Sequence, residues 1–163
     1  MNVSRIFKWS VLLALAVTPT TLYGQVLGID LTFESVGGSL PVAGAGTSTA
    51  SLNFGTVSAF QPVGGTVTRT LTASDYTMST QFAVRVTKGV LVFSSNYTLR
   101  GRLTVAQPLT WKLRDVTMST SFATVATSQP YASPLPHPVA FTIPFSAASG
   151  AISTTLEVLA IAN

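Results

Sequence analysis

Few side chains in this 163-residue sequence are of the kinds that catalyse reactions or bind metals. His137 is the only histidine, it stands between two prolines, and there is no cysteine. A zinc site made of histidine and cysteine ligands therefore cannot form. A Ser-His-Asp triad would need His137 as its base, and no G-x-S-x-G pattern marks a nucleophile.

Carboxylates offer a second chemistry, because glycoside hydrolysis uses a pair of them. The chain has five: Asp30, Glu34, Asp75, Asp115 and Glu157. Two of them, Asp75 and Asp115, are expected to bond backbone N–H groups in turns. There is no Asp and Asn cluster at calcium spacing, and no Gly-rich phosphate motif that leads into a helix. We therefore expect no enzyme, no metal and no cofactor, with a hydrolase based on His137 or an aspartate pair as the least favoured alternative.

The elements that carry these side chains are expected to follow an N-terminal leader. Residues 1–24 contain Arg5 and Lys8, then an apolar run at 9–17, then a polar, turn-prone stretch. This layout predicts a secretory signal peptide that is cleaved before Gln25. The apolar run is too short to cross a hydrocarbon core of about 30 Å as a helix, so we expect no membrane span after cleavage. Residues 25–163 would then form one domain.

The leader also accounts for part of the positive charge. The whole chain has a net charge of +4, with nine Lys and Arg against five Asp and Glu. Arg5 and Lys8 would leave with the leader, and the remaining basic residues are spread along the chain. This distribution argues against nucleic acid as a partner. Without cysteine, the exported fold must be held by packing and by sheet hydrogen bonds.

Alternating strands separated by turns make up the rest of the chain. In residues 51–72, Leu52 and Phe54 alternate with polar or small residues, and Gly64-Gly65 separates them from a second alternating run. Residues 128–138 hold four prolines and predict an extended loop rather than a central strand. Residues 75–87 and 115–127 share T-M-S-T and F-A and predict two equivalent turn-plus-strand units. Together these patterns predict an all-β, two-sheet β-sandwich of about nine or ten strands.

The first strand of the mature part has two open interpretations. An apolar row at period two must be buried, and here it consists of Leu27, Ile29, Leu31 and Phe33. It is either the first strand of the chain's own sandwich or a donor strand that completes a neighbouring subunit. The second interpretation would use residues 37–49 as a flexible linker through Gly37, Gly38, Gly44 and Gly46, whereas the first treats them as an ordinary loop.

The run L-N-F-G-T-V-S at 52–58, followed by G-G-T-V-T at 64–68, resembles a bacterial family of exported domains related to spore coat protein U and fimbrial subunits. The resemblance implies an immunoglobulin-like or pilin-like sandwich in the periplasm, at the cell surface or in an extracellular appendage. It also implies self-association or other fimbrial subunits as partners, together with a periplasmic chaperone. The chain departs from fimbrial subunits in lacking their frequent disulfide and, at its end, their penultimate tyrosine.

These observations predict a non-catalytic, exported structural protein, a surface-coat or fimbrial-type subunit that assembles by β-strand complementation. The alternative is a monomeric adhesin that binds carbohydrate or another surface. Such a module needs exposed aromatic rings, for which the candidates are Tyr76, Tyr97 and Tyr131. Trp111 lies between Leu109 and Leu113 in an alternating pattern, so we expect it in the core. A variant of the adhesin hypothesis treats the threonines at 66, 68, 70 and 72 as an ice-binding row.

Overall fold

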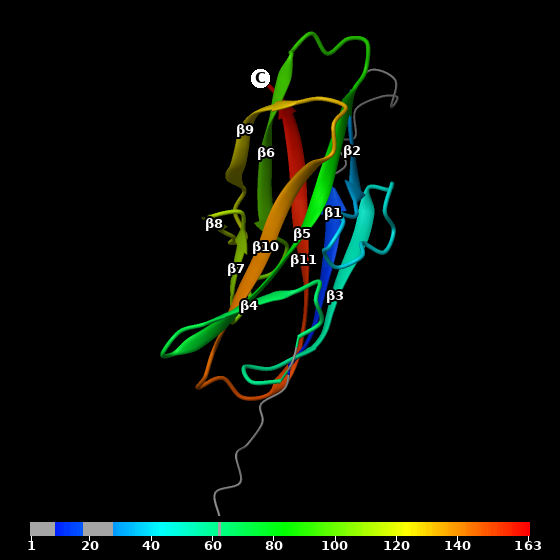
Figure 1. Ribbon diagram of the computed structural model, residues 1–163. Coiled ribbons are helices and arrows are strands. Elements are labelled where there is room, and N and C mark those ends of the chain that lie inside the picture. The colour runs from blue at the N-terminus through cyan, green and yellow to red at the C-terminus, as the bar shows by residue number, and fades with distance from the viewer. Residues whose placement is uncertain (1–8, 18–27, 62) are drawn as a thin grey trace, which may run out of the picture.

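The computed structural model describes residues 9–17, 28–61 and 63–163, and these residues form two facing β-sheets without an α-helix (Figure 1). Sheet A has five strands in the order β3 (Thr49–Val57), β1 (Trp9–Val17), β11 (Gly150–Ala162), β6 (Asn96–Leu103) and β9 (Ala123–Pro130). Sheet B has the order β2 (Ile29–Glu34), β5 (Asp75–Lys88), β10 (Leu135–Pro144), β7 (Thr110–Leu113) and β8 (Val116–Thr117), with β4 (Thr68–Leu71) also paired to β5. The predicted all-β, two-sheet sandwich is confirmed, and the described part of the chain has eleven strands.

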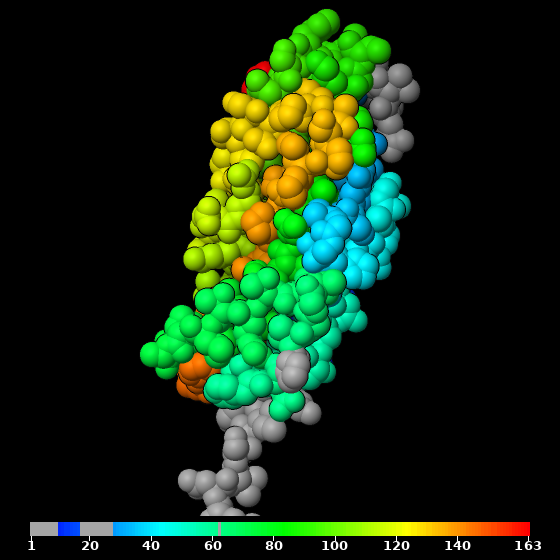
Figure 2. Space-filling view, in the orientation of Figure 1, coloured from blue at the N-terminus to red at the C-terminus, as the bar shows by residue number. Residues whose placement is uncertain are grey.

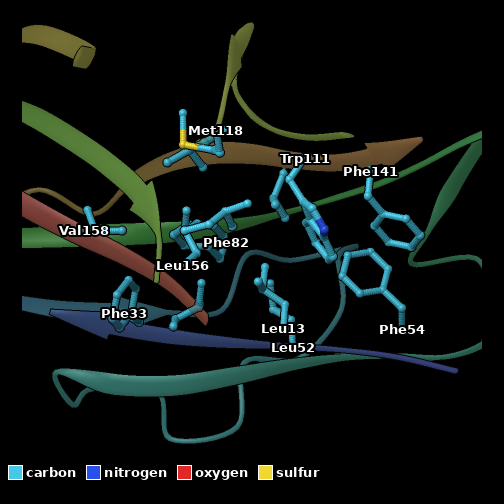
Figure 3. Packing of buried hydrophobic residues seen from close by; sticks show 14 of the residues in the cluster. Leu13, Phe33, Leu52, Phe54, Phe82, Trp111, Met118, Phe141, Leu156 and Val158 are labelled. Carbon is cyan, nitrogen blue, oxygen red and sulfur yellow. The ribbon is translucent and has the colours of Figure 1, made fainter. Parts of the chain in front are cut away.

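Alternation explains why these segments are strands. Along β6, residues Tyr97, Leu99, Gly101 and Leu103 are buried and the residues between them are partly exposed. A strand with one buried and one solvated face has this pattern, because successive side chains point to opposite sides of the sheet. The inward residues of both sheets form one core (Figure 3). Trp111 lies in this core as expected, with its ring 4.8 Å from that of Phe141.

The prediction that residues 128–138 form a loop is wrong at both ends, because residues 128–130 belong to β9 and residues 135–138 to β10. Residues 131–134 are a loop, but Pro136 and Pro138 belong to β10, a central strand of sheet B. β10 pairs with β5 along its whole length, whereas its pairing with β7 covers only residues 139–142. The Pro138 carbonyl accepts a hydrogen bond from the Arg114 N–H on the β7 side, at 2.7 Å. The missing proline N–H therefore faces the edge where no ladder runs, which makes these prolines tolerable.

The prediction that residues 75–87 and 115–127 form two equivalent turn-plus-strand units is wrong, because their T-M-S-T segments differ in structure. Residues 77–80 lie in the middle of β5, a strand of 14 residues with β4 on one side and β10 on the other. In the second copy Thr117 ends the two-residue strand β8, and the following residues are irregular. β8 pairs only with β7, and this pairing stops at Thr117. The four residues are extended in β5, where β4 and β10 lie on either side, and become irregular after Thr117, where the ladder with β7 ends.

Candidate functional site

The donor-strand candidate lies within the chain's own sheet B. β2 pairs antiparallel with β5 over all six of its residues. Leu31 and Phe33 are buried in the core, Ile29 is partly buried, and Leu27 lies outside the described residues. The ring of Phe33 meets that of Phe82 edge to face at 5.8 Å. The own-sandwich interpretation is the arrangement seen here, and exchange of this strand between chains stays a prediction.

The other edge of β2 is also bonded. The Phe33 N–H donates to the Thr47 carbonyl at 2.9 Å, and the Gly46 N–H donates to the Phe33 carbonyl at 2.7 Å. Glu34 forms an ion pair with Arg85 on β5, and this hydrogen-bonded partner lowers the pKa of the Glu34 carboxyl. Residues 37–48 thus form a loop that is bonded to β2 through residues 46 and 47. Gly44, at φ +84°, lies so close to the Thr49 carbonyl that a Cβ would be 2.8 Å from its oxygen.

The apolar run of the predicted leader forms β1, in the interior of sheet A. β1 pairs parallel with β11 from residue 9 to 17 and antiparallel with β3. Val11, Leu13 and Leu15 point inward, and none is more than 1% exposed. The predicted cleavage point before Gln25 lies outside the described residues. An apolar run whose only polar residue is Ser10 suits a buried strand as well as a leader, so periodicity alone could not reveal this pairing.

A β-bulge in β3 sets the register of this pairing. Val11 lies opposite Gly55 and Leu12 opposite Asn53, so one residue of β3 has no partner. Gly55 has a φ of +63°, and its N–H donates a hydrogen bond to Asn53 Oδ1 at 2.8 Å. A left-handed glycine at such a point is the usual way to insert an extra residue. The L-N-F-G motif therefore positions the strand that lies beside it.

We call the position filled by β1 the strand slot. Its walls are the facing backbone edges of β3 and β11, and its inward neighbours are Leu52, Ile152 and Leu156. Figure 3 shows Leu13 next to Leu52 in the layer between the sheets. Without β1 the two walls would stand about 10 Å apart, which is two strand spacings. A slot of this kind can bind an extended strand with apolar residues at alternate positions.

The aromatic candidates for sugar stacking are mostly buried. Tyr76 is 3% exposed and Tyr97 is fully buried, and burial raises the pKa of the Tyr97 hydroxyl to about 12. Tyr131 is half-buried, 5.3 Å from Tyr97 ring to ring, and Lys88 Nζ stands 5.2 Å from its ring centroid. The structure thus brings Tyr97 and Tyr131 together but leaves Tyr76 at the other end of β5.

His137 is also buried, in β10. Its ring is fully covered and lies 6.4 Å from that of Phe82, and burial lowers the pKa of the imidazole to about 4. Neither ring nitrogen has a hydrogen-bond partner in the described part of the chain. Within the same residues, no three His, Asp or Glu side chains gather as metal ligands. No helix long and apolar enough to span a membrane occurs there either.

No family model matches this sequence, and no curated protein gives a significant match to it.

Proposed function

We propose that this protein is a non-catalytic, exported structural subunit of surface-coat or fimbrial type, with an immunoglobulin-like or pilin-like sandwich that is completed by a β-strand from another chain. One observation carries the proposal: residues 9–17, the apolar run of the predicted signal peptide, form the interior strand β1 of sheet A. The part predicted to be exported, residues 25–163, would then contain an open strand slot.

An open slot is costly in two ways. The facing edges of β3 and β11 would each present unpaired N–H and C=O groups, which is a template for pairing with another chain. The core would also lose three fully buried side chains, Val11, Leu13 and Leu15. At about 1.5–3 kcal/mol each, they contribute roughly 5–9 kcal/mol. That is comparable to the whole stability of an ordinary domain, about 5–15 kcal/mol, so an unfilled slot favours association.

The length of chain before β2 bears on which strand would fill the slot. Cleavage before Gln25 leaves residues 25–28 ahead of Ile29, whereas β1 has nine residues. A free arm this short cannot cover the slot. The donor is therefore either residues 26–34 of a second copy, released from β5, or a strand of another subunit or chaperone. The contacts on both edges of β2 favour the second source.

Complementation in trans tests the proposal. The protein from Gln25 onward is prepared alone, with a synthetic peptide of residues 9–17, and with the same peptide carrying aspartate in place of Leu13. We expect the protein alone to associate or to unfold at low temperature, and the first peptide to give a monomer with a raised Tm. The aspartate peptide should have no effect. A stable monomer whose Tm is the same with and without either peptide would overturn the strand-slot proposal.

The source of the donor is tested in the same assay. A peptide of residues 26–34 is added to the protein from Gln25, next to the peptide of residues 9–17. If second copies supply the donor, the peptide of residues 26–34 raises the Tm as well and competes with assembly. If a different protein supplies it, only the peptide of residues 9–17 has this effect.

A further inference from the structure

The turn between β5 and β6 has an unusual composition. Residues 89–95 read G-V-L-V-F-S-S, and Val90 and Leu91 occupy the corner of the turn. Turn corners ordinarily carry Gly, Asn, Asp, Ser or Pro, because these residues suit the backbone angles or bond the backbone locally. Four successive apolar residues at this place are not explained by turn geometry.

The apolar side chains of this turn point into solvent. Val90 is 77% exposed, Leu91 57% and Phe93 87%, the highest value for a large apolar side chain among the described residues. The turn protrudes at one end of an elongated molecule, as the uppermost green loop of Figures 1 and 2. We call Val90, Leu91 and Phe93 the apolar tip. Large exposed apolar side chains gathered at one point mark an interaction site.

An ordered base holds the apolar tip in place. The Val92 N–H donates to the Gly89 carbonyl at 3.1 Å, and the Gly89 N–H donates to the Gly28 carbonyl at 2.7 Å. From the other side, Lys88 Nζ donates to the Ser94 carbonyl at 2.6 Å. The turn is therefore closed across its neck, so the exposed side chains are presented by a fixed loop.

The shape and size of the apolar tip select its partner. A stable protein interface needs about 1,000 Å² or more of matched surface, and three side chains on a convex loop cover only a few hundred. A lipid bilayer needs no matching cavity, because its acyl chains and headgroups move aside. No charged residue occurs from Gly89 to Leu99, whereas Lys88 lies over the ring of Tyr131 at the base of the turn. A lysine in this position favours the headgroup level, because its apolar stem can lie against the acyl region while its ammonium group stays at the polar surface.

From these observations we propose that the apolar tip inserts into the surface of a lipid bilayer, with the exposed Lys88 at the headgroups. Binding would be peripheral and reversible, since three side chains reach only the outer part of the acyl region. This site is separate from the strand slot, and the proposal holds whether or not the slot binds another chain.

A single-cysteine label tests the insertion, because the chain has no cysteine of its own. Full-length Phe93→Cys carries an environment-sensitive dye, and Phe60→Cys serves as the matched control. Phe60 is 79% exposed and lies in the loop after β3, outside the tip. With phosphatidylcholine vesicles, we expect a blue shift and quenching by nitroxide-labelled lipids for the label at 93 only. No shift at 93, or equal shifts at both positions, would overturn the proposal.

Vesicle co-flotation of unlabelled, full-length protein provides an independent readout. The triple variant Val90→Ser, Leu91→Ser, Phe93→Ser should lower the partition coefficient at least tenfold, because each buried apolar side chain is worth about tenfold or more. The control variant Val105→Ser removes another exposed apolar side chain, 62% exposed, and should leave it unchanged. Unchanged flotation of the triple variant refutes the proposal. If the protein does not float with vesicles but self-associates without them, and the triple variant does not, then the partner of the apolar tip is a second copy and the bilayer proposal is refuted.

Discussion

β1 and β2 are both short apolar strands from the N-terminal part of the chain, and they are held in different ways. β1 lies between two strands, and no charged side chain occurs in residues 9–17. β2 has one strand neighbour, but it is also bonded to the 46–47 loop and carries the Glu34–Arg85 ion pair. The interactions of β1 are backbone ladders and apolar burial, which any alternating apolar strand can reproduce. The interactions of β2 include specific side-chain partners, so we expect β1 rather than β2 to be the strand that another chain could replace.

The largest effect is expected from a charge on the inner face of β1. In the full-length chain, Leu13→Asp should lower the free energy of unfolding by about 5 kcal/mol or more, because it buries an unpaired carboxylate. Leu12→Asp is the matched control: Leu12 is 40% exposed and Leu13 is fully buried, so the control should cost less than about 1 kcal/mol. Chemical denaturation measures both. Equal, small losses would mean that β1 is not needed in the core of the full-length protein.

The second effect concerns β2. Phe33→Ala should cost about 3–5 kcal/mol of unfolding free energy, since it leaves a cavity beside Phe82. Thr32→Ala, on the outer face of the same strand, should cost much less. Both are measured on monomeric protein by denaturation. If Phe33→Ala spares the monomer but prevents assembly, β2 is the exchanged strand and the contrast with β1 is reversed.

Acid should weaken the β2 side of the molecule through His137. Burial lowers the pKa of this histidine to about 4, below an unfolded value of about 6.5. The unfolded state therefore binds a proton more readily, so the free energy of unfolding is highest above pH 6.5 and decreases as pH falls toward 4. The loss amounts to about 3 kcal/mol. His137 packs on Phe82, which in turn contacts Phe33 of β2. Hydrogen exchange at falling pH should therefore show the β2–β5 amides losing protection before those of β1 and β11.

Replacing the histidine provides the control for that pH dependence. His137→Leu removes the titrating group, and it should flatten the stability profile between pH 6.5 and 4 while changing stability little at pH 7, since the ring nitrogens have no partner to lose. An unchanged profile in this variant would assign the acid sensitivity to other groups.

The smallest effect is expected at the Glu34–Arg85 ion pair. Arg85 lowers the pKa of Glu34, so the stabilisation exists above the unfolded pKa of about 4.5 and disappears as pH falls through the folded pKa. Because both side chains are partly exposed, Glu34→Gln should weaken β2 only slightly at pH 7, and less so in high salt. Denaturation at pH 7 and pH 3 measures the difference. If Glu34→Gln lowers the free energy of unfolding by the same amount at pH 3 as at pH 7, the effect does not come from an ion pair.

Much of the fold could be predicted from period-two patterns. The alternation of Trp111 with Leu109 and Leu113 correctly predicted that Trp111 lies in the core, and alternating strands separated by turns predicted the two-sheet sandwich. Of the donor-strand candidates that the structure describes, Leu31 and Phe33 are buried and Ile29 is partly buried. The pattern did not show which strand pairs with this apolar row, because the same row suits a strand in the chain's own sheet and a strand donated to a neighbouring subunit.

The sequence by itself determined which residues face inward, because alternation of side chains along a strand is a local property. Only the tertiary structure decided which strands are neighbours. Pro138 lies in β10 at a place where the β7 ladder does not use its missing N–H. T-M-S-T is extended throughout in β5 but not beyond Thr117 in the second copy. Residues 9–17 lie between β3 and β11. Pairing joins residues far apart in the chain, and its free energy depends on the edges and cavities that the rest of the molecule presents.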